Sequence, residues 1–169
     1  MNQKDFLNII DPFKDKVFRL AKRLLVSTEE AEDATQELYL KLWRNKEKFA
    51  SYKNVEAFAM TMTKNYCLDR LKSKQADTLK LVHSNYQEKG VGLNKKIELQ
   101  DSVSKVHQLI NELPEQQRLI IQLRDVEQYD FDEIAKMLDL KPATVRVGLS
   151  RARKKIKEQL IKQHSYGVS

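Results

Sequence analysis

The sequence predicts an all-α protein made of two small helical domains joined by a linker. Only four glycines and three prolines interrupt its 169 residues, and the composition is rich in Leu, Lys, Glu, Gln and Ala, which favour helix. Apolar residues recur at spacings of three and four in two long stretches, and this pattern weakens between them. No stretch alternates apolar and polar residues as a β-strand does. The length suits two small domains.

The first domain, residues 1–74, is predicted to contain three helices around one small core. Helix starts are indicated by Asp11-Pro12, by a capping box of Ser27 and Glu30, and by Asn54. We expect the second helix to end near Asn45 and the third near Lys74, with a polar loop between the two helices. The residues expected to face the core are Phe13, Val17, Leu20 and Leu24, then Ala31, Ala34, Leu38 and Leu42, then Val55, Phe58, Met62 and Tyr66.

Residues 75–104 are interpreted as the linker, because polar residues predominate there and Gly90 and Gly92 interrupt the pattern. Helix is expected to return around Lys95. The second domain, residues 105–169, begins with an apolar stripe that Pro114 ends, and a strongly apolar helix is predicted over residues 115–127. That stripe consists of Val103, Val106, Ile110 and Leu113.

A helix-turn-helix is the clearest motif, and it lies between Asp130 and Leu160. Asp130 and Glu133 form a capping box for a short helix, residues 139–141 make a tight turn, and Pro142 starts the next helix. In this next helix a buried stripe is predicted at Val145, Leu149, Ala152, Ile156 and Leu160. The opposite face carries small, polar and basic groups, as a helix that enters the major groove requires. The alternative is a helical hairpin whose charged face is merely solvated.

Charge is distributed unevenly along the chain. Between Lys141 and Lys162 the basic residues exceed the acidic ones by seven, which equals the excess of the whole chain. By contrast, residues 27–37 hold five acidic residues and no Lys or Arg. One strongly basic and one strongly acidic helix indicate two different partners. For the acidic helix, the alternative is that Glu29, Glu30 and Asp33 only complement the helix dipole, which leaves Glu37 unexplained.

These residues resemble the extracytoplasmic-function type of RNA polymerase sigma factor. The runs Asn111–Arg118 (NELPEQQR), Phe131–Ala135 (FDEIA), Thr144–Arg146 (TVR) and Ser150–Lys155 (SRARKK) are similar to sigma region 4. Ala31–Glu37 (AEDATQE), continuing through Leu42-Trp43, and Lys64–Leu71 (KNYCLDRL) are similar to region 2. The resemblance implies a three- or four-helix region 2 bundle and a region 4 helix-turn-helix domain. It also implies an alternative sigma factor that binds core RNA polymerase, recognises the −10 and −35 promoter elements and promotes DNA opening.

The resemblance implies three sets of binding residues. The recognition helix would read the −35 element through Thr144, Arg146, Val147, Ser150, Arg151 and Lys154. The −10 element would be read by Lys64, Asn65, Asp69 and Arg70, with Phe49 and Tyr52 stacking on an unpaired base or, equally, filling the core. The clamp helices of the polymerase beta-prime subunit would contact Asp33, Gln36 and Glu37. Gly148 departs from the family, whose members often carry a side chain there, and it would admit either DNA backbone or a neighbouring helix.

The sequence and the resemblance also bear on partners and ligands other than polymerase and promoter DNA. The family implies an anti-sigma factor. We expect no cofactor, no metal and no small-molecule substrate, because no ligand spacing, phosphate loop or nucleophile-base pair is present, and hence no enzyme. No segment is long and apolar enough for membrane insertion, and the single cysteine fits the reducing cytoplasm. The rival functions are a helix-turn-helix regulator that binds duplex DNA without polymerase, and a helical adaptor.

Overall fold

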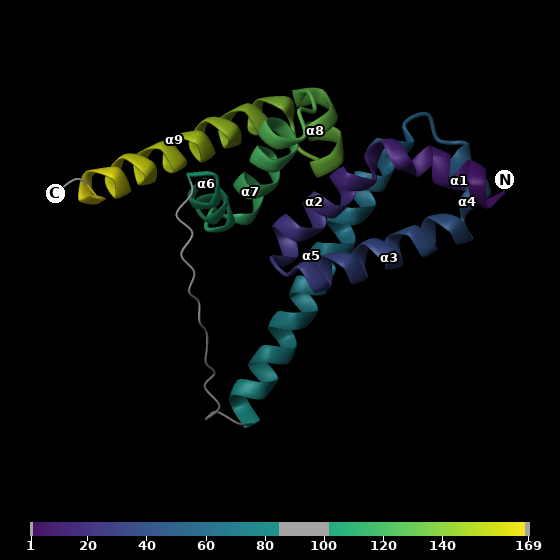
Figure 1. Cartoon of the computed structure of the whole chain (residues 1–169), viewed down its shortest axis with the longest axis horizontal. Helices are drawn as coiled ribbons and strands as arrows, with labels where there is room; N and C mark the ends of the chain where they lie inside the picture. The colour runs from purple at the N-terminus through teal and green to yellow at the C-terminus, as the bar shows by residue number, and fades with distance from the viewer. Residues whose placement is uncertain (1, 85–101, 168–169) are drawn as a thin grey trace.

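The computed structural model describes residues 2–84 and 102–167, and every regular element in these ranges is helical. The predicted all-α fold with two small domains is confirmed, as Figure 1 shows. The predicted helix return near Lys95 lies outside the described residues. In the described part of the chain, no helix is long and apolar enough to cross a lipid bilayer.

The first domain is a bundle centred on α2, which packs against both α3 and α5. Its elements are α1 (Gln3–Ile10), the 3₁₀ turn η1 (Asp11–Phe13), α2 (Lys14–Leu25), α3 (Thr28–Arg44), α4 (Lys46–Ala50) and α5 (Val55–Ser84). The stripes predicted for α2 and α3 are buried. Ser27 Oγ accepts from the Glu30 amide at 3.2 Å, and Asn54 Oδ1 accepts from the Ala57 amide at 2.9 Å, so both predicted caps are present.

Three details of this domain differ from the sequence prediction. The chain before Asp11 forms a helix, α1, because Asn2 caps it and Phe6 and Ile10 bury their side chains in the bundle. The predicted loop after Asn45 contains a short helix, α4. The capping box at Ser27 is only half formed, because the Glu30 carboxylate turns away to pair with a lysine on α5 instead.

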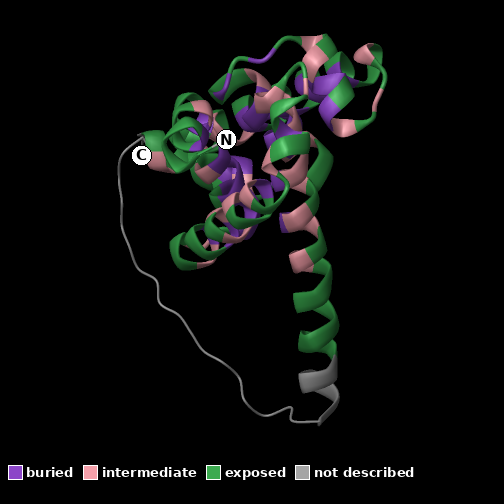
Figure 2. Ribbon diagram, turned by 90° about the vertical axis from the view of Figure 1, so that its right-hand side faces the viewer, coloured by how far each residue is buried: buried purple, intermediate pink, exposed green. Residues whose placement is uncertain are grey.

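The third helix was predicted wrongly in its length and in its buried face. It continues to Ser84, ten residues past Lys74, and residues 72–79 are exposed where the helix projects from the bundle (Figure 2). An exposed helix needs no apolar stripe, and residues 75–81 include no glycine or proline to stop it. The predicted stripe of Val55, Phe58, Met62 and Tyr66 is only half-buried, whereas the fully buried positions are Ala59, Met60, Thr63 and Cys67.

The second domain contains α6 (Ser102–Asn111), α7 (Glu115–Ile121), η2 (Gln122–Val126), α8 (Phe131–Leu138) and α9 (Pro142–Gly167). The apolar run predicted as one helix is α7 followed by a π-helical turn, η2, in which the Glu127 amide donates to the Gln122 carbonyl at 3.1 Å. Helix α9 packs on α6, α7 and α8. The two domains touch where α8 meets α5 and where η2 meets α2.

Candidate DNA and polymerase interfaces

The predicted helix-turn-helix is present as α8, a tight turn and α9. The capping box is complete, because Asp130 Oδ1 accepts from the Glu133 amide at 2.8 Å and Glu133 Oε1 accepts from the Asp130 amide at 3.0 Å. Asp139 ends α8 in the left-handed conformation with φ of 56°, which Asp tolerates better than most residues. The Leu140 amide then donates to the Ala135 carbonyl at 2.9 Å, so the turn has a fixed geometry.

Helix α9 has one buried and one exposed face, as the sequence predicts. Val145, Leu149, Ala152 and Ile156 are buried against the rest of the domain, whereas Leu160, the last residue of the predicted stripe, is half-buried. All six predicted −35 residues are exposed: Thr144, Arg146, Val147, Ser150, Arg151 and Lys154. Val147 is a large apolar side chain with 48% of its surface exposed, which suits contact with a thymine methyl group.

The basic side chains on α9 differ in the contacts that they make within the protein. Arg153 makes two hydrogen bonds to the Asp125 carboxylate, one of them from Nε at 3.0 Å, so its charge is matched within the domain. Arg146 stacks over the Phe131 ring at 5.1 Å, and Arg124 stacks over the same ring at 4.6 Å. Within the described residues no ion pair involves Arg151 or Lys154, so both charges remain available to a phosphate or a base.

Gly148 lies against the protein interior. It is buried, and a Cβ added there would stand 2.6 Å from Cδ1 of Ile120 on α7. Of the two roles that the sequence left open, the close approach of a neighbouring helix is therefore the one that the packing supports. This close approach sets how tightly α9 sits on α7.

Of the four polar −10 candidates on α5, two are exposed and two make contacts with other parts of the protein. Asn65 and Asp69 are exposed. Arg70 Nη1 lies 3.5 Å from the Tyr66 hydroxyl, and its Nε lies 3.9 Å from the Glu30 carboxylate on α3. Lys64 Nζ donates to the Met137 carbonyl of α8 at 2.9 Å, and burial lowers the pKa of Lys64. Asn65 and Asp69 are thus the residues of this set that are open to solvent.

The two aromatic candidates of the first domain also differ. Phe49 is 1% exposed and its ring lies 5.9 Å from that of Phe6, so it is a core residue with no face free for a base. Tyr52 is half-buried and stacks on Phe58 with ring centroids 4.4 Å apart. Tyr52 also lines a pocket of about 190 Å³ between the end of α3, α4 and the start of α5. Phe49 lines the same pocket but is only 1% exposed, so Tyr52 is the one of the two with appreciable surface open to a base.

The acidic candidates lie on the outer side of α3. Asp33 and Gln36 are exposed and Glu37 is half-buried, while Ala34 and Leu38 on the same helix face the core. The helix therefore shows solvent a polar, negatively charged surface backed by a rigid apolar one. Such a surface suits a basic partner groove.

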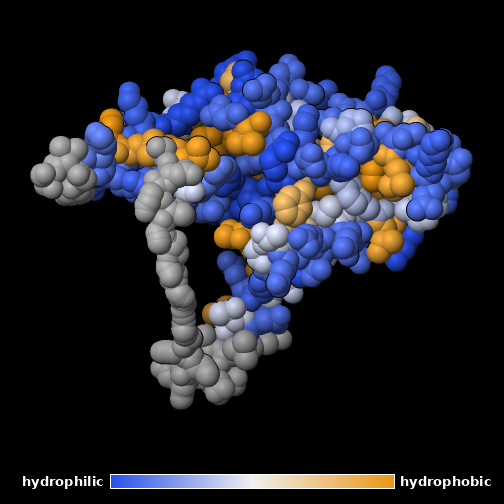
Figure 3. Space-filling view, viewed as in Figure 1, coloured by the Kyte–Doolittle hydropathy of each residue, from blue (hydrophilic) through white to orange (hydrophobic). Residues whose placement is uncertain are grey.

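An apolar groove on the second domain offers a further protein-binding surface. It lies between α6, α7 and α9, has a volume of about 560 Å³, and is lined mainly by Val106, Ile110, Ile121, Ile156 and Leu160, with Arg153 and Lys157 also at the site. Figure 3 shows apolar side chains gathered along α9 on this side. Contiguous exposed apolar surface of this kind marks protein contacts.

Sequence reasoning missed a cluster of polar residues between the domains. Arg19 and Arg23 on α2 contact Gln122 and Glu127 near η2, about a hundred positions away in the chain. The one local sign of this cluster in the sequence is that a polar residue, Gln122, interrupts the apolar run that begins at Leu119. Nothing in the sequence pairs it with α2.

The fold and these surfaces define a two-domain helical protein with a helix-turn-helix in its second domain and an acidic surface on α3. The family model "Sigma-70 region 2" matches residues 9–76, and the model "Sigma-70, region 4" matches residues 104–156. The chain belongs to the sigma-70 family and, by its relatives, to the extracytoplasmic-function (ECF) group.

Relatives match along nearly the whole chain. The ECF RNA polymerase sigma factor SigW of Bacillus subtilis is 25% identical over an alignment 169 residues long. The alignment covers 94% of this chain and 90% of SigW. The sigma factor RpoE of Bartonella quintana, solved in complex with the anti-sigma factor NepR, has a TM-score of 0.76 at 20% identity, covering 93% of this chain and 97% of RpoE. CnrH, solved with the cytosolic domain of CnrY, has a TM-score of 0.70 at 18% identity, covering 95% of this chain and 90% of CnrH.

Proposed function

We propose that this alternative sigma factor uses its two domains to bind core RNA polymerase and two elements of promoter DNA. The first domain binds core RNA polymerase through the acidic face of α3 and reads the −10 element with α5. The second domain reads the −35 element with α9. The observation that carries the proposal is α9, whose exposed residues are those expected to meet DNA while its opposite face is buried.

Within α9, the exposed groups divide by chemistry. Thr144 and Ser150 offer short hydroxyl groups and Val147 an apolar contact, which suit base edges, and Arg151 has the planar fork that matches guanine. Lys154, farther along the helix, is a point charge that suits phosphate.

In the first domain, Asn65 is the residue best placed for an unpaired −10 base. It is exposed on α5 and offers both a donor and an acceptor. Tyr52, beside the 190 Å³ pocket, provides an aromatic edge for stacking, which contributes about 1–3 kcal/mol per base. Melting would be driven by binding the extruded bases, and polymerase supplies the catalysis.

An anti-sigma factor is the expected regulatory partner. The similar structure of RpoE is a complex with such a partner, the anti-sigma factor NepR. The apolar groove beside α6, which Lys157 borders and where Arg153 is already paired with Asp125, suits a helix that has an apolar face. Both the chain and its polymerase are expected to act in the cytoplasm.

Binding to purified core RNA polymerase is the first test. The variant Asp33→Lys with Glu37→Lys should bind core polymerase at least about tenfold more weakly, because like charges would then face a basic docking surface. The matched control is Asp5→Lys with Asp15→Lys, which makes the same change in net charge on exposed residues of α1 and α2. Circular dichroism should be equal in all three proteins.

The outcome separates the candidate functions. Equal polymerase affinity in parent, variant and control would contradict the docking surface on α3. A parent chain that binds promoter duplex but no polymerase would instead indicate a helix-turn-helix regulator.

A further inference from the structure

A pocket of about 590 Å³ between α2, α6 and η2 has an excess of positive charge. Of the described residues that line it, three are basic, Arg19, Lys22 and Arg23, and none is acidic. The charge of Arg19 is matched, because its guanidinium donates to the Glu127 carboxylate from Nε at 2.8 Å and from Nη2 at 2.7 Å. No ion pair within the described residues involves Lys22 or Arg23. Two positive charges at the pocket therefore have no negative partner in this part of the chain.

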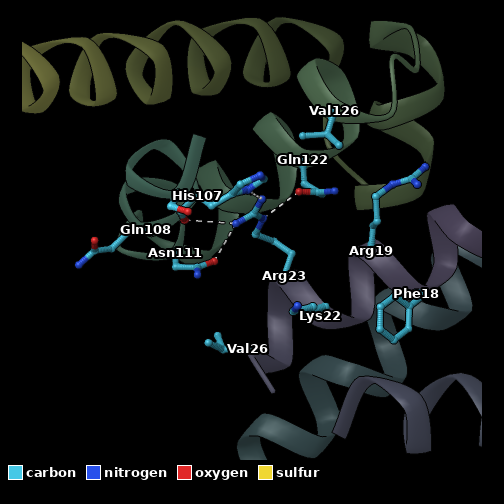
Figure 4. A pocket seen from close by; sticks show the side chains of 11 residues that line it. Phe18, Arg19, Lys22, Arg23, Val26, His107, Gln108, Asn111, Gln122 and Val126 are labelled. Carbon is cyan, nitrogen blue, oxygen red and sulfur yellow. Dashed lines mark hydrogen bonds between the residues drawn. The ribbon is translucent and has the colours of Figure 1, made fainter. Parts of the chain in front are cut away.

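Arg23 is the unusual member of this set, because its charge is buried among neutral groups. It is 7% exposed and donates to Gln122 Oε1 at 2.8 Å and to Asn111 Oδ1 at 2.9 Å, as Figure 4 shows. Burial and then the positive charge of Arg118 lower the pKa of the Arg23 guanidinium. A buried charge is normally paired with an opposite charge, since removing it from water is costly. An anion in the pocket would supply the charge that Arg23 lacks.

Hydrogen-bond donors for such an anion come from two helices. Within the described residues, four of the five N–H groups of Arg23 have acceptors, which leaves one on Nη2. His107 Nδ1 lies 2.6 Å from Nη2 and must accept, so the neutral ring carries its proton on Nε2. His107 and Lys22 are both exposed at the pocket. This number of donors suits the three oxygens of a phosphate group better than the two of a carboxylate.

The remainder of the pocket suits an organic group. Phe18, Val26 and Val126 contribute apolar surface to its wall. Sites for small organic molecules have volumes of about 300–1,000 Å³ and combine apolar walls with a few polar groups. A bare inorganic ion would leave this apolar wall unused.

We propose that this pocket binds a small phosphorylated organic molecule, whose phosphate meets Lys22, Arg23 and His107 and whose organic part lies against Phe18 and Val126. None of the residues assigned above to polymerase or promoter DNA lines the pocket. The site is therefore additional to the proposed function and does not depend on it.

The test compares two probes on the full chain, inorganic phosphate and phenyl phosphate, titrated at constant ionic strength against chloride. Ring signals of His107 in NMR spectra report the pocket, and those of His164, exposed on α9, report anions that gather on the basic helix. The site variant is Lys22→Gln, which removes an exposed charge and leaves the contacts of Arg23 in place. The matched control is Lys105→Gln, which makes the same change in charge on α6, at an exposed position outside the pocket.

Phenyl phosphate should shift the His107 signals to saturation and bind at least about threefold more tightly than inorganic phosphate, because its ring buries apolar surface. Lys22→Gln should weaken binding at least about fivefold, whereas Lys105→Gln should bind like the parent. Shifts of His107 that do not saturate, or that only parallel those of His164, would indicate an adventitious ion only and overturn the site. Equal affinity for the two probes would overturn the assignment to an organic phosphate.

A second titration distinguishes a free molecule from the phosphates of the DNA backbone. Duplex DNA should leave the His107 signals unchanged, and phenyl phosphate should still shift them when the duplex is present. If the duplex shifts His107 and phenyl phosphate does not, the pocket takes backbone phosphate and the proposal fails. A chain that binds phenyl phosphate at His107 but neither DNA nor polymerase would contradict the proposed function alone.

Discussion

Alanine substitutions at Arg151 and Lys154 give the sharpest test of how α9 meets DNA. Both side chains are exposed and neither forms an ion pair within the described residues, whereas Asp125 neutralises Arg153. Removing a phosphate contact lowers the dependence of log affinity on log salt by about 0.9. A fourfold increase in salt should then weaken Lys154→Ala about 3.5-fold less than it weakens the parent, on every DNA sequence.

Arg151→Ala should behave differently, because a guanidinium that bonds a guanine edge discriminates between sequences. Its loss should weaken binding to the cognate −35 duplex by about 1–3 kcal/mol, or about 5- to 150-fold, with little effect on a scrambled duplex. Binding of the full chain to both duplexes across a salt series measures the two effects together, and Lys162→Ala, an exposed lysine near the end of α9, is the control. If both variants bind cognate DNA like the parent at every salt concentration, the exposed face of α9 does not enter the groove.

Three further predictions concern other parts of the molecule. Asn65→Ala should reduce open-complex formation at a cognate promoter more than duplex binding, and an equal loss in permanganate footprinting and gel-shift assays would assign it to the closed duplex. Gly148→Leu should lower the free energy of unfolding in urea by about 1–3 kcal/mol through overpacking against α7, whereas Ser150→Leu on the exposed face should not. Burial, Arg23 and Lys22 lower the pKa of His107, so the docked state favours the neutral ring. The stability contributed by His107 is then full above the ordinary His pKa of 6.5 and is lost as pH falls below it, which urea unfolding across a pH series should report and His107→Gln should abolish.

Local sequence patterns were sufficient for the helix-turn-helix. Its capping box, its turn and the buried stripe from Val145 to Ile156 are each set by residues a few positions apart, and all three are present in the structure. The exposed binding residues on α9 follow from the same periodicity. For such elements the physical determinants lie within one or two helical turns, so the sequence displays them directly.

Other features depend on contacts that no local pattern reveals. The burial of Phe49 requires Phe6 from α1, a helix short enough that its apolar pair gave little signal. The length of α5 follows from residues that favour helix without any partner to bury against. Arg23 meets Gln122 from 99 positions away, and neither residue type distinguishes an interface from solvent.

The contact between α2 and η2 is made by charged and polar side chains, and this limits how firmly it fixes the two domains. Burying Arg23 and Glu127 costs desolvation energy, and their hydrogen bonds recover that cost only while the geometry is intact. Gln122 is shared, so displacing it removes a partner from both charged groups at once. Once water reaches one charge it can solvate the other, and opening should therefore be cooperative. An apolar interface of the same size would cost more free energy to open, because exposing apolar surface to water is unfavourable.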